Sequence, residues 1–363
     1  MTEVADRRFM SLALSLGRRG LGRTWPNPSV GCVIVRDGRI LARARTADGG
    51  RPHAEVTALA ACDAREATAY VTLEPCAHVG ETPSCAEELA RAGIARVVIA
   101  TTDPDPRTAG QGIARLKAAG VAVETGLGGD EAREDLAGFL TRVTAGRPTV
   151  TLKLAASVDG RIATATGESQ WITGPLARRD VHAMRARHDA VLVGAGTARA
   201  DDPTLTIRDL GQDRQPVRIV FSRRLDLPLP SRLSQSVEAA PLWICHGTEA
   251  PAAAVARWAE AGARLFRCPT EGRQIAPAAA LQALGAAGLT RIFCEGGGSL
   301  GASLLGADLV EDLICFTAGT ALGAEGLPMI GALGLDALAD APRFRLAGVR
   351  PIGPDIRHHW RRR

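Results

Sequence analysis

The feature that most constrains the fold of this chain is a strand–helix alternation that restarts once near the middle of the sequence. Short apolar runs typical of strands, such as residues 31–35 (GCVIV), alternate with stretches of helical composition, such as residues 85–92 (CAEELARA). Alternation of this kind is typical of α/β proteins, in which helices cover a sheet. A turn at residues 145–148 (AGRP) interrupts the pattern. We therefore expect two α/β domains, over residues 1–146 and 149–363, which suits a chain of 363 residues.

Composition and charge exclude several classes of protein. With 46% hydrophobic and 23% charged residues, the chain is neither disordered nor fibrous. No apolar run approaches the roughly 20 residues that cross a bilayer, and no cleavage site follows the early apolar stretch 9–16, so we expect a cytoplasmic protein without a membrane partner. The net charge is +5, but the arginines are dispersed rather than gathered in a stripe or arm, which argues against a nucleic-acid partner. Eight cysteines without a secretion signal do not indicate a disulfide framework.

Three potential metal ligands and one carboxylate occur in order in the first half. His53 stands in the run PHAE, Cys76 ends the run LEPC after a strand-like stretch, and Cys85 opens a predicted helix. One imidazole and two thiolates leave the fourth position of a tetrahedral Zn²⁺ ion open to water, as a catalytic site requires. Glu55 follows His53 by two residues, a spacing at which helical side chains do not face each other, so Glu55 is free to move protons. This set matches the zinc nucleobase deaminases, whose glutamate is a general acid and base and not a ligand.

The spacing of the two cysteines departs from the compact P-C-x-x-C of that class, because eight residues separate Cys76 from Cys85. The inserted loop could contact a bulkier substrate. Three other interpretations stay open: unrelated buried side chains without a metal, a purely structural zinc ion for which no fourth ligand is apparent, and a deaminase that acts on RNA or DNA. Dispersed arginines and an aromatic content of only 4% argue against the last.

The second half contains a glycine-rich turn after a strand-like run. Residues 295–301 (EGGGSLG) open a predicted helix, where backbone N–H groups can approach a phosphate. The run fits G-x-G-x-x-G, but it lies late in the chain and lacks the acidic residue expected about 20 residues further on. On the residues alone, a cofactor loop and a tight strand–helix turn are equally good interpretations. Lys153 is one of only two lysines in this arginine-rich chain, which suggests that a point-charge amine matters at that position.

Longer motifs in both halves resemble the bifunctional deaminase–reductases of riboflavin biosynthesis. The resemblance rests on residues 25–35 (WPNPSVGCVIV), 52–56 (PHAEV), 70–89 (YVTLEPCAHVGETPSCAEEL), 152–161 (LKLAASVDGR) and 167–173 (GESQWIT). It implies an α/β fold, with an N-terminal cytidine-deaminase-like α/β/α layered domain and a C-terminal α/β domain similar to dihydrofolate reductase. It also implies a small-molecule substrate, a phosphoribosylaminopyrimidine, which a zinc-dependent deamination and then an NADPH-dependent reduction of its ribosyl group would convert. We expect a homo-oligomer, either a homodimer or a homotetramer.

The resemblance also assigns residues to each site. In the deaminase half, Glu55 would be catalytic and the Zn²⁺ ligands would be His53, Cys76 and Cys85. NADPH would be contacted by Ala155, Trp171, Thr197, Ser222, Gly297, Gly298, Ser299, Leu300, Gly301, Ala302 and Ser303. Substrate would be held by Asn27, Ser169, Arg185, Asp201, Leu205, Arg208 and Glu295. Arginine suits a ribose phosphate because its forked donors bind oxyanions, and the two acidic residues of the reductase half can hold ribose hydroxyls or an amine.

Glu81 departs from the resembled family, which usually carries a basic residue at this point of the loop between the two cysteines. If that residue meets the substrate phosphate, a carboxylate in its place would repel the phosphate. Two interpretations follow. Either Glu81 points to water and another arginine serves, which we favour, or the deaminase half acts on a different substrate.

Overall fold

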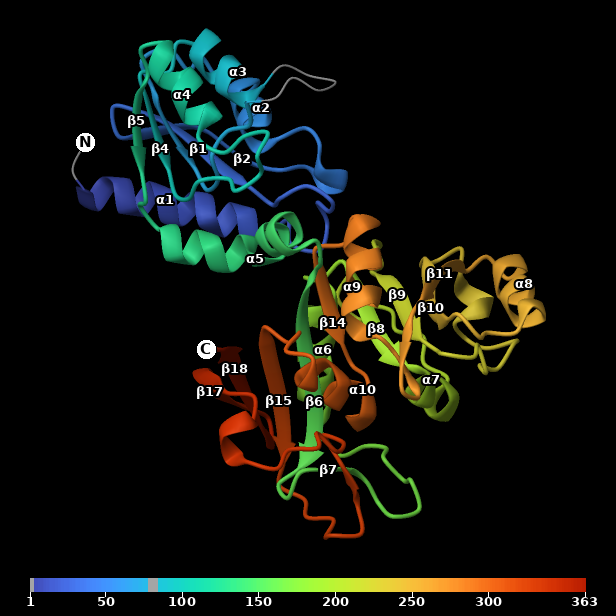
Figure 1. Ribbon diagram of the computed structural model, residues 1–363. Helices are drawn as coiled ribbons and strands as arrows, with labels where there is room; N and C mark the ends of the chain where they lie inside the picture. The colour runs from blue at the N-terminus through green and yellow to red at the C-terminus, as the bar shows by residue number, and fades with distance from the viewer. Residues whose placement is uncertain (1–2, 78–83) are drawn as a thin grey trace. The chain divides into compact units, whose positions relative to one another are not determined.

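The structure is a computed structural model that describes residues 3–77 and 84–363 (Figure 1). Glu81 therefore lies outside the described residues. The chain divides into two compact units, Met1–Gly146 and Arg147–Arg363, each with its own sheet. Among the described residues, no helix is both long and apolar enough to cross a membrane.

The first unit is a five-stranded sheet in the order β2-β1-β3-β4-β5, between two layers of helices (Figure 1). Its elements are α1 (Glu3–Arg18), β1 (Gly31–Arg36), β2 (Arg39–Arg45), the 3-10 turn Asp48–Gly50, α2 (Ala54–Leu59), β3 (Thr68–Val71), α3 (Cys85–Arg91), β4 (Arg96–Ile99), α4 (Gln111–Ala118), β5 (Ala122–Thr125) and α5 (Gly129–Ala145). Strand β1 pairs antiparallel with β2 and β3, whereas β3, β4 and β5 are parallel.

Alternating side chains of β1 show why two helical layers form. Cys32 and Ile34 are buried in a cluster with residues of α2, α3 and α4, whereas Val33 and Val35 are buried in a cluster with residues of α1. Successive side chains of a strand point to opposite faces, so a strand that is apolar at every position requires cover on both faces. The α/β/α layering expected for the first half is confirmed.

The second unit is built on a nine-stranded sheet in the order β11-β10-β9-β8-β14-β6-β15-β18-β17. Its strands are β6 (Thr149–Ser157), β7 (Arg161–Ala163), β8 (Ala190–Gly194), β9 (Val217–Phe221), β10 (Leu242–Gly247), β11 (Arg264–Cys268), β12 (Thr270–Glu271), β13 (Gln274–Ile275), β14 (Arg291–Cys294), β15 (Asp312–Ala318), β16 (Leu327–Pro328), β17 (Phe344–Ile352) and β18 (Asp355–Arg362). Its helices are α6 (Pro175–Arg185), α7 (Ala195–Asp201), α8 (Ala252–Glu260), α9 (Pro277–Ala286) and α10 (Gly298–Gly306), with 3-10 turns at Ser234–Ser236 and Leu338–Asp340.

The large sheet of the second unit is parallel from β11 to β15 and ends in the antiparallel hairpin β17–β18. Helix α6 packs on one face, where Val181 is buried with Phe293 and Phe316. On the other face α10 lies close to β6, since a Cβ added to Gly301 would be 3.5 Å from a methyl carbon of Leu152. Helices on both faces of a mostly parallel sheet confirm the second α/β expectation.

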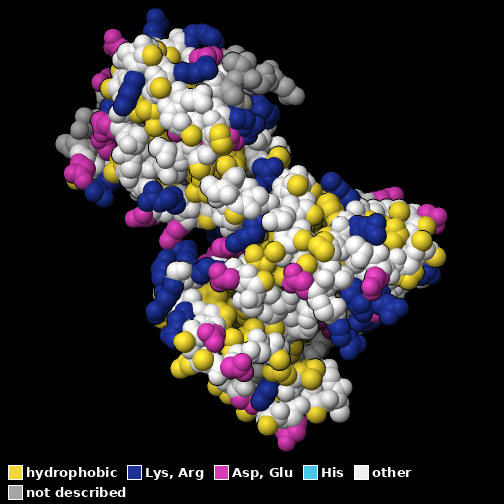
Figure 2. Space-filling model, in the orientation of Figure 1, with side chains coloured by type: hydrophobic (Ala, Val, Ile, Leu, Met, Phe, Trp, Pro, Cys, Tyr) yellow, Lys and Arg dark blue, Asp and Glu magenta, His cyan; other side chains and the backbone are white. Residues whose placement is uncertain are grey.

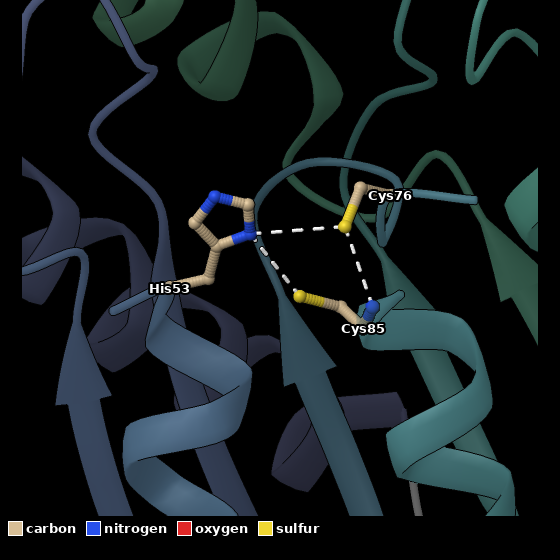
Figure 3. Close-up of side chains that lie close together, drawn as sticks. All are labelled: His53, Cys76 and Cys85. Carbon is tan, nitrogen blue, oxygen red and sulfur yellow. Dashed lines mark hydrogen bonds between the residues drawn. The ribbon is translucent and has the colours of Figure 1, made fainter. Parts of the chain in front are cut away.

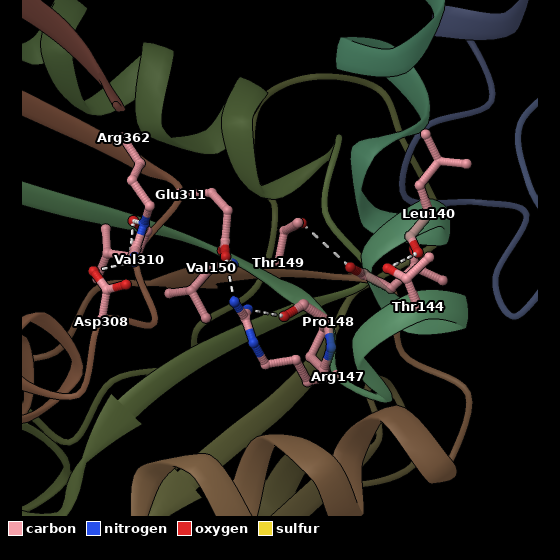
Figure 4. Close-up of polar contacts among 11 residues, drawn as sticks. Leu140, Thr144, Arg147, Pro148, Thr149, Val150, Asp308, Val310, Glu311 and Arg362 are labelled. Atoms are coloured by element: carbon pink, nitrogen blue, oxygen red, sulfur yellow. Dashed lines mark hydrogen bonds and ion pairs between the residues drawn. The ribbon is translucent and has the colours of Figure 1, made fainter. Parts of the chain in front are cut away.

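Polar contacts fix the start of the second unit against the sheet (Figure 4). The Arg147 Nη2 atom donates to Glu311 Oε1 at 2.7 Å, and the backbone N–H of Val150 donates to Glu311 Oε2 at the same distance. Nearby, the Arg362 guanidinium donates to the Val310 carbonyl at 2.7 and 2.9 Å and pairs with Asp308. These contacts secure β6, the central strand that carries Lys153 and Ala155 into the sheet.

Candidate functional site

Three potential metal ligands of the first unit converge from three different elements (Figure 3). His53 is the N-cap residue of α2, Cys76 follows β3, and Cys85 is the first residue of α3. The His53 Nδ1 atom lies 3.2 Å from Cys85 Sγ and 3.7 Å from Cys76 Sγ. All three ligand atoms lie within 4.8 Å of one another, and no other such group of His, Cys, Asp and Glu occurs in residues 3–77 and 84–363.

The helix starts explain why these ligands face one another. The Ser84 hydroxyl caps α3 by accepting from the backbone N–H of Glu87 at 3.3 Å, so the first N–H groups of the helix stay available. The N–H of Cys85 donates to Cys76 Sγ at 3.3 Å, and the N–H of Ala86 donates to the Cys76 carbonyl at 3.2 Å. Helix N-terminal N–H groups favour a thiolate over a thiol.

The acid–base properties of the three ligands are linked. A hydrogen bond from the Cys85 thiol lowers the pKa of Cys76 to about 4, and the same hydrogen bond, together with burial, raises the pKa of Cys85 well above its usual range. The hydrogen bond to Cys76 raises the pKa of His53. The imidazole and the two thiols thus share protons through hydrogen bonds. A cation bound between their ligand atoms would take the place of those protons.

The geometry of the cluster fits Zn²⁺. Tetrahedral coordination with a Zn–S distance of ~2.3 Å and a Zn–N distance of ~2.0 Å separates a nitrogen from a sulfur ligand by about 3.5 Å. The two observed nitrogen–sulfur distances, 3.2 and 3.7 Å, bracket that value. A site with one nitrogen and two sulfur donors also favours Zn²⁺ over Mg²⁺ or Ca²⁺, which prefer oxygen donors.

Glu55 lies beside this cluster, on the first turn of α2. Its side chain is buried at 4% exposure and interacts with the Cys85 thiol. Burial raises the pKa of Glu55 to about 7, although the nearby His53 opposes the shift. A carboxyl group with a pKa near neutrality can both accept and return a proton, as general acid–base catalysis requires.

Asn27, expected to hold substrate, contacts the loop that leads to the cluster. Its Nδ2 atom donates to the Gly50 carbonyl at 3.1 Å. Gly50 has φ +88°, and a Cβ at this position would lie 2.4 Å from Asn27 Nδ2. The amide group of Asn27 therefore supports the turn that precedes His53.

The second unit contains a cavity of about 990 Å³ at the carboxyl ends of its central parallel strands. Ligands of open α/β sheets characteristically bind at this edge. Nine of the residues expected to contact NADPH or substrate line the cavity: Ala155, Ser169, Thr197, Asp201, Glu295, Gly297, Gly298, Ser299 and Leu300. The glycine-rich turn contributes because α10 starts there, and the Gly297 N–H donates to Thr197 Oγ1 at 3.2 Å.

The remaining expected residues of the second unit do not line this cavity. Gly301, Ala302 and Leu205 are part of the packed interior, and Ser222 is buried with its hydroxyl 3.3 Å from Asp226. Trp171 is 67% exposed, with the Arg178 guanidinium 4.6 Å from its ring centroid. The other three predicted residues that do not line the cavity are Ser303, Arg185 and Arg208.

Largely buried charged side chains lie at one part of the cavity lining. Arg185 forms a forked ion pair with Glu295, with Nε 2.5 Å from Oε1 and Nη2 3.0 Å from Oε2. Burial opposes ionisation of Glu295, but Arg185 and Lys153 hold its pKa below the usual value. Burial lowers the pKa of Lys153 and raises that of Asp201. Arg185 does not line the cavity itself, but it contacts Glu295, which does.

Four arginines that line the cavity were not predicted from the sequence: Arg199, Arg223, Arg224 and Arg273. Two of them pair with carboxylates, Arg199 with Asp226 at 2.9 Å and Arg223 with Glu249 at 3.5 Å. Neither Arg224 nor Arg273 has an ion-pair partner within the described part of the chain. Two arginines that follow Ser222 at the end of the apolar strand β9 were the available signal, because residues just after a parallel strand lie at the ligand-binding edge.

The face of the protein shown in Figure 2 carries charged side chains of both signs. On the face shown in Figure 2, Lys and Arg side chains occur in small groups with Asp and Glu between them. On this face, interspersed charges of both signs do not make the concentrated basic surface that binds phosphate backbones.

Comparison with known proteins agrees with both units. A family model described as the RibD C-terminal domain matches residues 148–357, and one described as the cytidine and deoxycytidylate deaminase zinc-binding region matches residues 3–101. The riboflavin biosynthesis protein RibD of Escherichia coli K12 is 41% identical, over 98% of each chain. That of Bacillus amyloliquefaciens is 39% identical, over 97% of this chain and 95% of its own.

Solved structures match over the same extent. RibD of Acinetobacter baumannii superposes with a TM-score of 0.89 at 37% identity, covering 99% of both chains. A diaminohydroxyphosphoribosylaminopyrimidine deaminase/5-amino-6-(5-phosphoribosylamino)uracil reductase from Thermotoga maritima superposes with a TM-score of 0.86 at 33% identity, also over 99% of both chains. The chain therefore belongs to the RibD family of riboflavin biosynthesis proteins, with a zinc-binding deaminase domain followed by a reductase domain.

Proposed function

We propose that this chain catalyses two successive reactions on one phosphoribosylaminopyrimidine. In residues 1–146, the amino group of a diamino-phosphoribosylaminopyrimidinone is removed by hydrolysis. In residues 149–363, the ribosyl group of that product is reduced to a ribityl chain by NADPH. We also propose that the enzyme acts in the cytoplasm as a homodimer or homotetramer. The observation that carries the proposal is the pairing, in one chain, of a His/Cys/Cys cluster beside a buried glutamate with a separate cavity lined by a glycine-rich turn and arginines.

In the first reaction His53, Cys76 and Cys85 would hold Zn²⁺. When bound, the ion supplies the positive charge that lowers the pKa of a water molecule toward neutrality. Glu55 has the position and the pKa, about 7, to accept a proton at neutral pH. The protonated carboxyl can then donate to the amino group that leaves as ammonia. Burial of Glu55 keeps its carboxyl from losing this proton to bulk solvent.

In the second reaction the cavity of the second unit would hold NADPH, which supplies the hydride. The start of α10 at Gly298 offers unpaired backbone N–H groups to a phosphate. The guanidinium groups of Arg224 and Arg273 support NADPH over NADH, because a 2′-phosphate would give two otherwise unpaired cations an anionic partner.

The substrate would occupy the part of the cavity that is lined by Lys153, Asp201 and Glu295. Lys153 offers an ammonium group with three donors, whereas Asp201 and Glu295 offer carboxylate acceptors. Donors and acceptors in this mixture suit a sugar rich in hydroxyl groups. Because Arg185 holds both oxygens of Glu295, that carboxylate keeps one orientation while substrate binds.

Glu55→Gln tests the division of labour. We expect this variant to release no ammonia from the diamino substrate, to retain one zinc ion per chain, and to oxidise NADPH at the wild-type rate when given the deaminated substrate. Gln keeps the size of the side chain but cannot accept the proton. Loss of zinc from the variant, or unchanged ammonia release, would contradict the role of Glu55.

Glu81→Lys tests the class of deaminase substrate. We expect the KM of deamination to remain unchanged, because we favour another arginine as the partner of the substrate phosphate. A large fall in KM would instead show that Glu81 opposes the phosphate, and would point to a different natural substrate for the deaminase half.

A further inference from the structure

Glu74 is a buried carboxylate beside the proposed zinc site, two residues before Cys76. It is 3% exposed and forms no ion pair with a described residue. Its oxygens accept instead from three backbone N–H groups: Oε2 from Asp103 at 3.3 Å and from Gly110 at 3.1 Å, and Oε1 from Ile113 at 3.2 Å. Its own N–H donates to the Thr101 carbonyl at 2.9 Å.

These three amides belong to the loop before α4 and to its first turn. Helix α4 begins after Gly110, a residue in the left-handed region at φ +75° that has no side chain with which to cap the helix. The first N–H groups of a helix have no partner within the helix, and a negative charge near them is favourable. Glu74 therefore supplies, from the end of another element, the cap that the sequence of α4 lacks.

The same contact anchors the peptide that carries a zinc ligand. A Cβ added to Gly112, in the first turn of α4, would lie 2.0 Å from the Pro75 carbonyl oxygen and 3.3 Å from Glu74 Cγ. The backbone of α4 is therefore packed directly against the Glu74–Pro75–Cys76 turn. On its other side Cys76 is held by α3, through the N–H groups of Cys85 and Ala86. Cys76 thus lies between two helix N-termini.

We infer that Glu74 is a positioning residue of the metal site, which holds the Cys76 sulfur in place by tying its turn to α4. The inference rests on the proposed zinc site. A carboxylate can accept from all three N–H groups, whereas a glutamine has one acceptor oxygen and would turn its NH₂ group toward an N–H donor. Because Pro75 fixes one backbone dihedral of the short connection, a shift of Glu74 is transmitted to Cys76.

The test compares the zinc affinity of the wild-type protein and Glu74→Gln by competition with a chromophoric chelator. Residues that orient metal ligands typically change affinity by 10- to 100-fold, and we expect a loss of roughly that size. The absorption bands of the Co²⁺-substituted protein should also shift, because they report the geometry of the sulfur ligands. The rate of NADPH oxidation with deaminated substrate should stay at the wild-type value, and an unchanged near-ultraviolet circular dichroism spectrum should show that the first unit is folded.

A second variant and two controls separate positioning from general loss of stability. Gly112→Ala should weaken zinc binding in the same way, since its Cβ pushes α4 off the Pro75 carbonyl while the Glu74 carboxylate itself is retained. Asp189→Asn removes a similarly buried carboxylate, whose Oδ2 accepts from the N–H groups of Thr290 at 2.6 Å and Arg291 at 2.9 Å in the other unit. Gly306→Ala adds a Cβ with no atom within 4 Å. Both controls should bind zinc as the wild type does.

The outcomes are distinct. Weaker zinc binding by Glu74→Gln and Gly112→Ala, with both controls unchanged, is the expected result. Wild-type affinity and an unshifted cobalt spectrum in either folded variant would overturn the inference and leave the proposed function intact. If Glu74→Gln loses its near-ultraviolet circular dichroism, Gly112→Ala decides between these results. A wild-type protein that binds no zinc would overturn the proposed function, and the inference with it.

Discussion

The ion pair between Arg185 and Glu295 permits a quantitative prediction about the second unit. The side chains are only 11% and 10% exposed, and two N–O contacts of 2.5 and 3.0 Å join them. Removal of one partner from such a pair leaves an unpaired buried charge and typically costs ~3–5 kcal/mol. In Arg185→Met, Lys153 remains near Glu295 and offsets part of the cost, so we expect about 3 kcal/mol, the lower end of that range.

Differential scanning calorimetry would measure this loss. About 3 kcal/mol corresponds to a fall of roughly 6–12 °C in the melting temperature of a unit of this size. The transition of the first unit, which contains neither residue, is an internal control and should not move. The double variant Arg185→Met/Glu295→Met should recover most of the loss, because it buries no unpaired carboxylate. A fall of less than about 2 °C in the single variant would show that the Arg185–Glu295 pair does not stabilise the second unit.

The pH dependence of the same variant follows from the sign of the pKa shift. In the wild type the folded-state pKa of Glu295 is lowered, so its stabilising contribution is present above the unfolded pKa of ~4.3 and is lost as pH falls through the folded value. Without Arg185, burial dominates and the folded pKa lies above the unfolded one. The penalty is then complete at high pH and disappears as the carboxyl takes up a proton. The stability difference between the two proteins should therefore narrow from pH 7 toward pH 4.5.

Three further outcomes test other parts of the account. Removal of zinc by a chelator should abolish ammonia release and leave NADPH oxidation with deaminated substrate unchanged, as a paired assay would show. Arg224→Ala or Arg273→Ala should raise the Kd for NADPH about tenfold, the effect of ~1.4 kcal/mol, and leave the Kd for NADH unchanged, whereas the exposed Arg232→Ala should alter neither in fluorescence titrations. Gly31→Ala should lower the melting temperature of the first unit alone, because its Cβ would lie 1.8 Å from the Ala13 carbonyl oxygen, an overlap worth about 1–3 kcal/mol or more.

Much of the fold and the residues of the proposed zinc cluster could be predicted from local sequence patterns. Strand β1 is apolar at consecutive positions, and the two-sided burial of Cys32 and Val33 follows directly from that pattern. His53, Cys76 and Cys85 could be singled out because each stands at the start of a helix or after a strand. Residues at such ends lie at the same edge of the sheet. Residue type and position together therefore indicate a site.

The residues that could not be predicted lie on segments far apart in the sequence, and only the order of the strands in the sheet brings them to one cavity. Arg224 follows β9 and Arg273 lies between β12 and β13, and no periodicity relates the two positions. Leu205, expected by resemblance to hold substrate, has a side chain that is 3% exposed and belongs to the core cluster that also contains Val220. Glu74 gave no signal of its own, because its partners are backbone N–H groups 29 to 39 residues away.

The most direct test of the two-reaction proposal uses one sample of the zinc-loaded protein, mixed with the diamino-phosphoribosylaminopyrimidinone and NADPH. Ammonia release and NADPH oxidation are followed together in this sample. We expect ammonia to appear first, NADPH oxidation to begin after a lag, and one NADPH to be consumed for each ammonia released. Oxidation of NADPH without ammonia, or ammonia with no later oxidation of NADPH, would contradict the claim that one chain performs both reactions in this order.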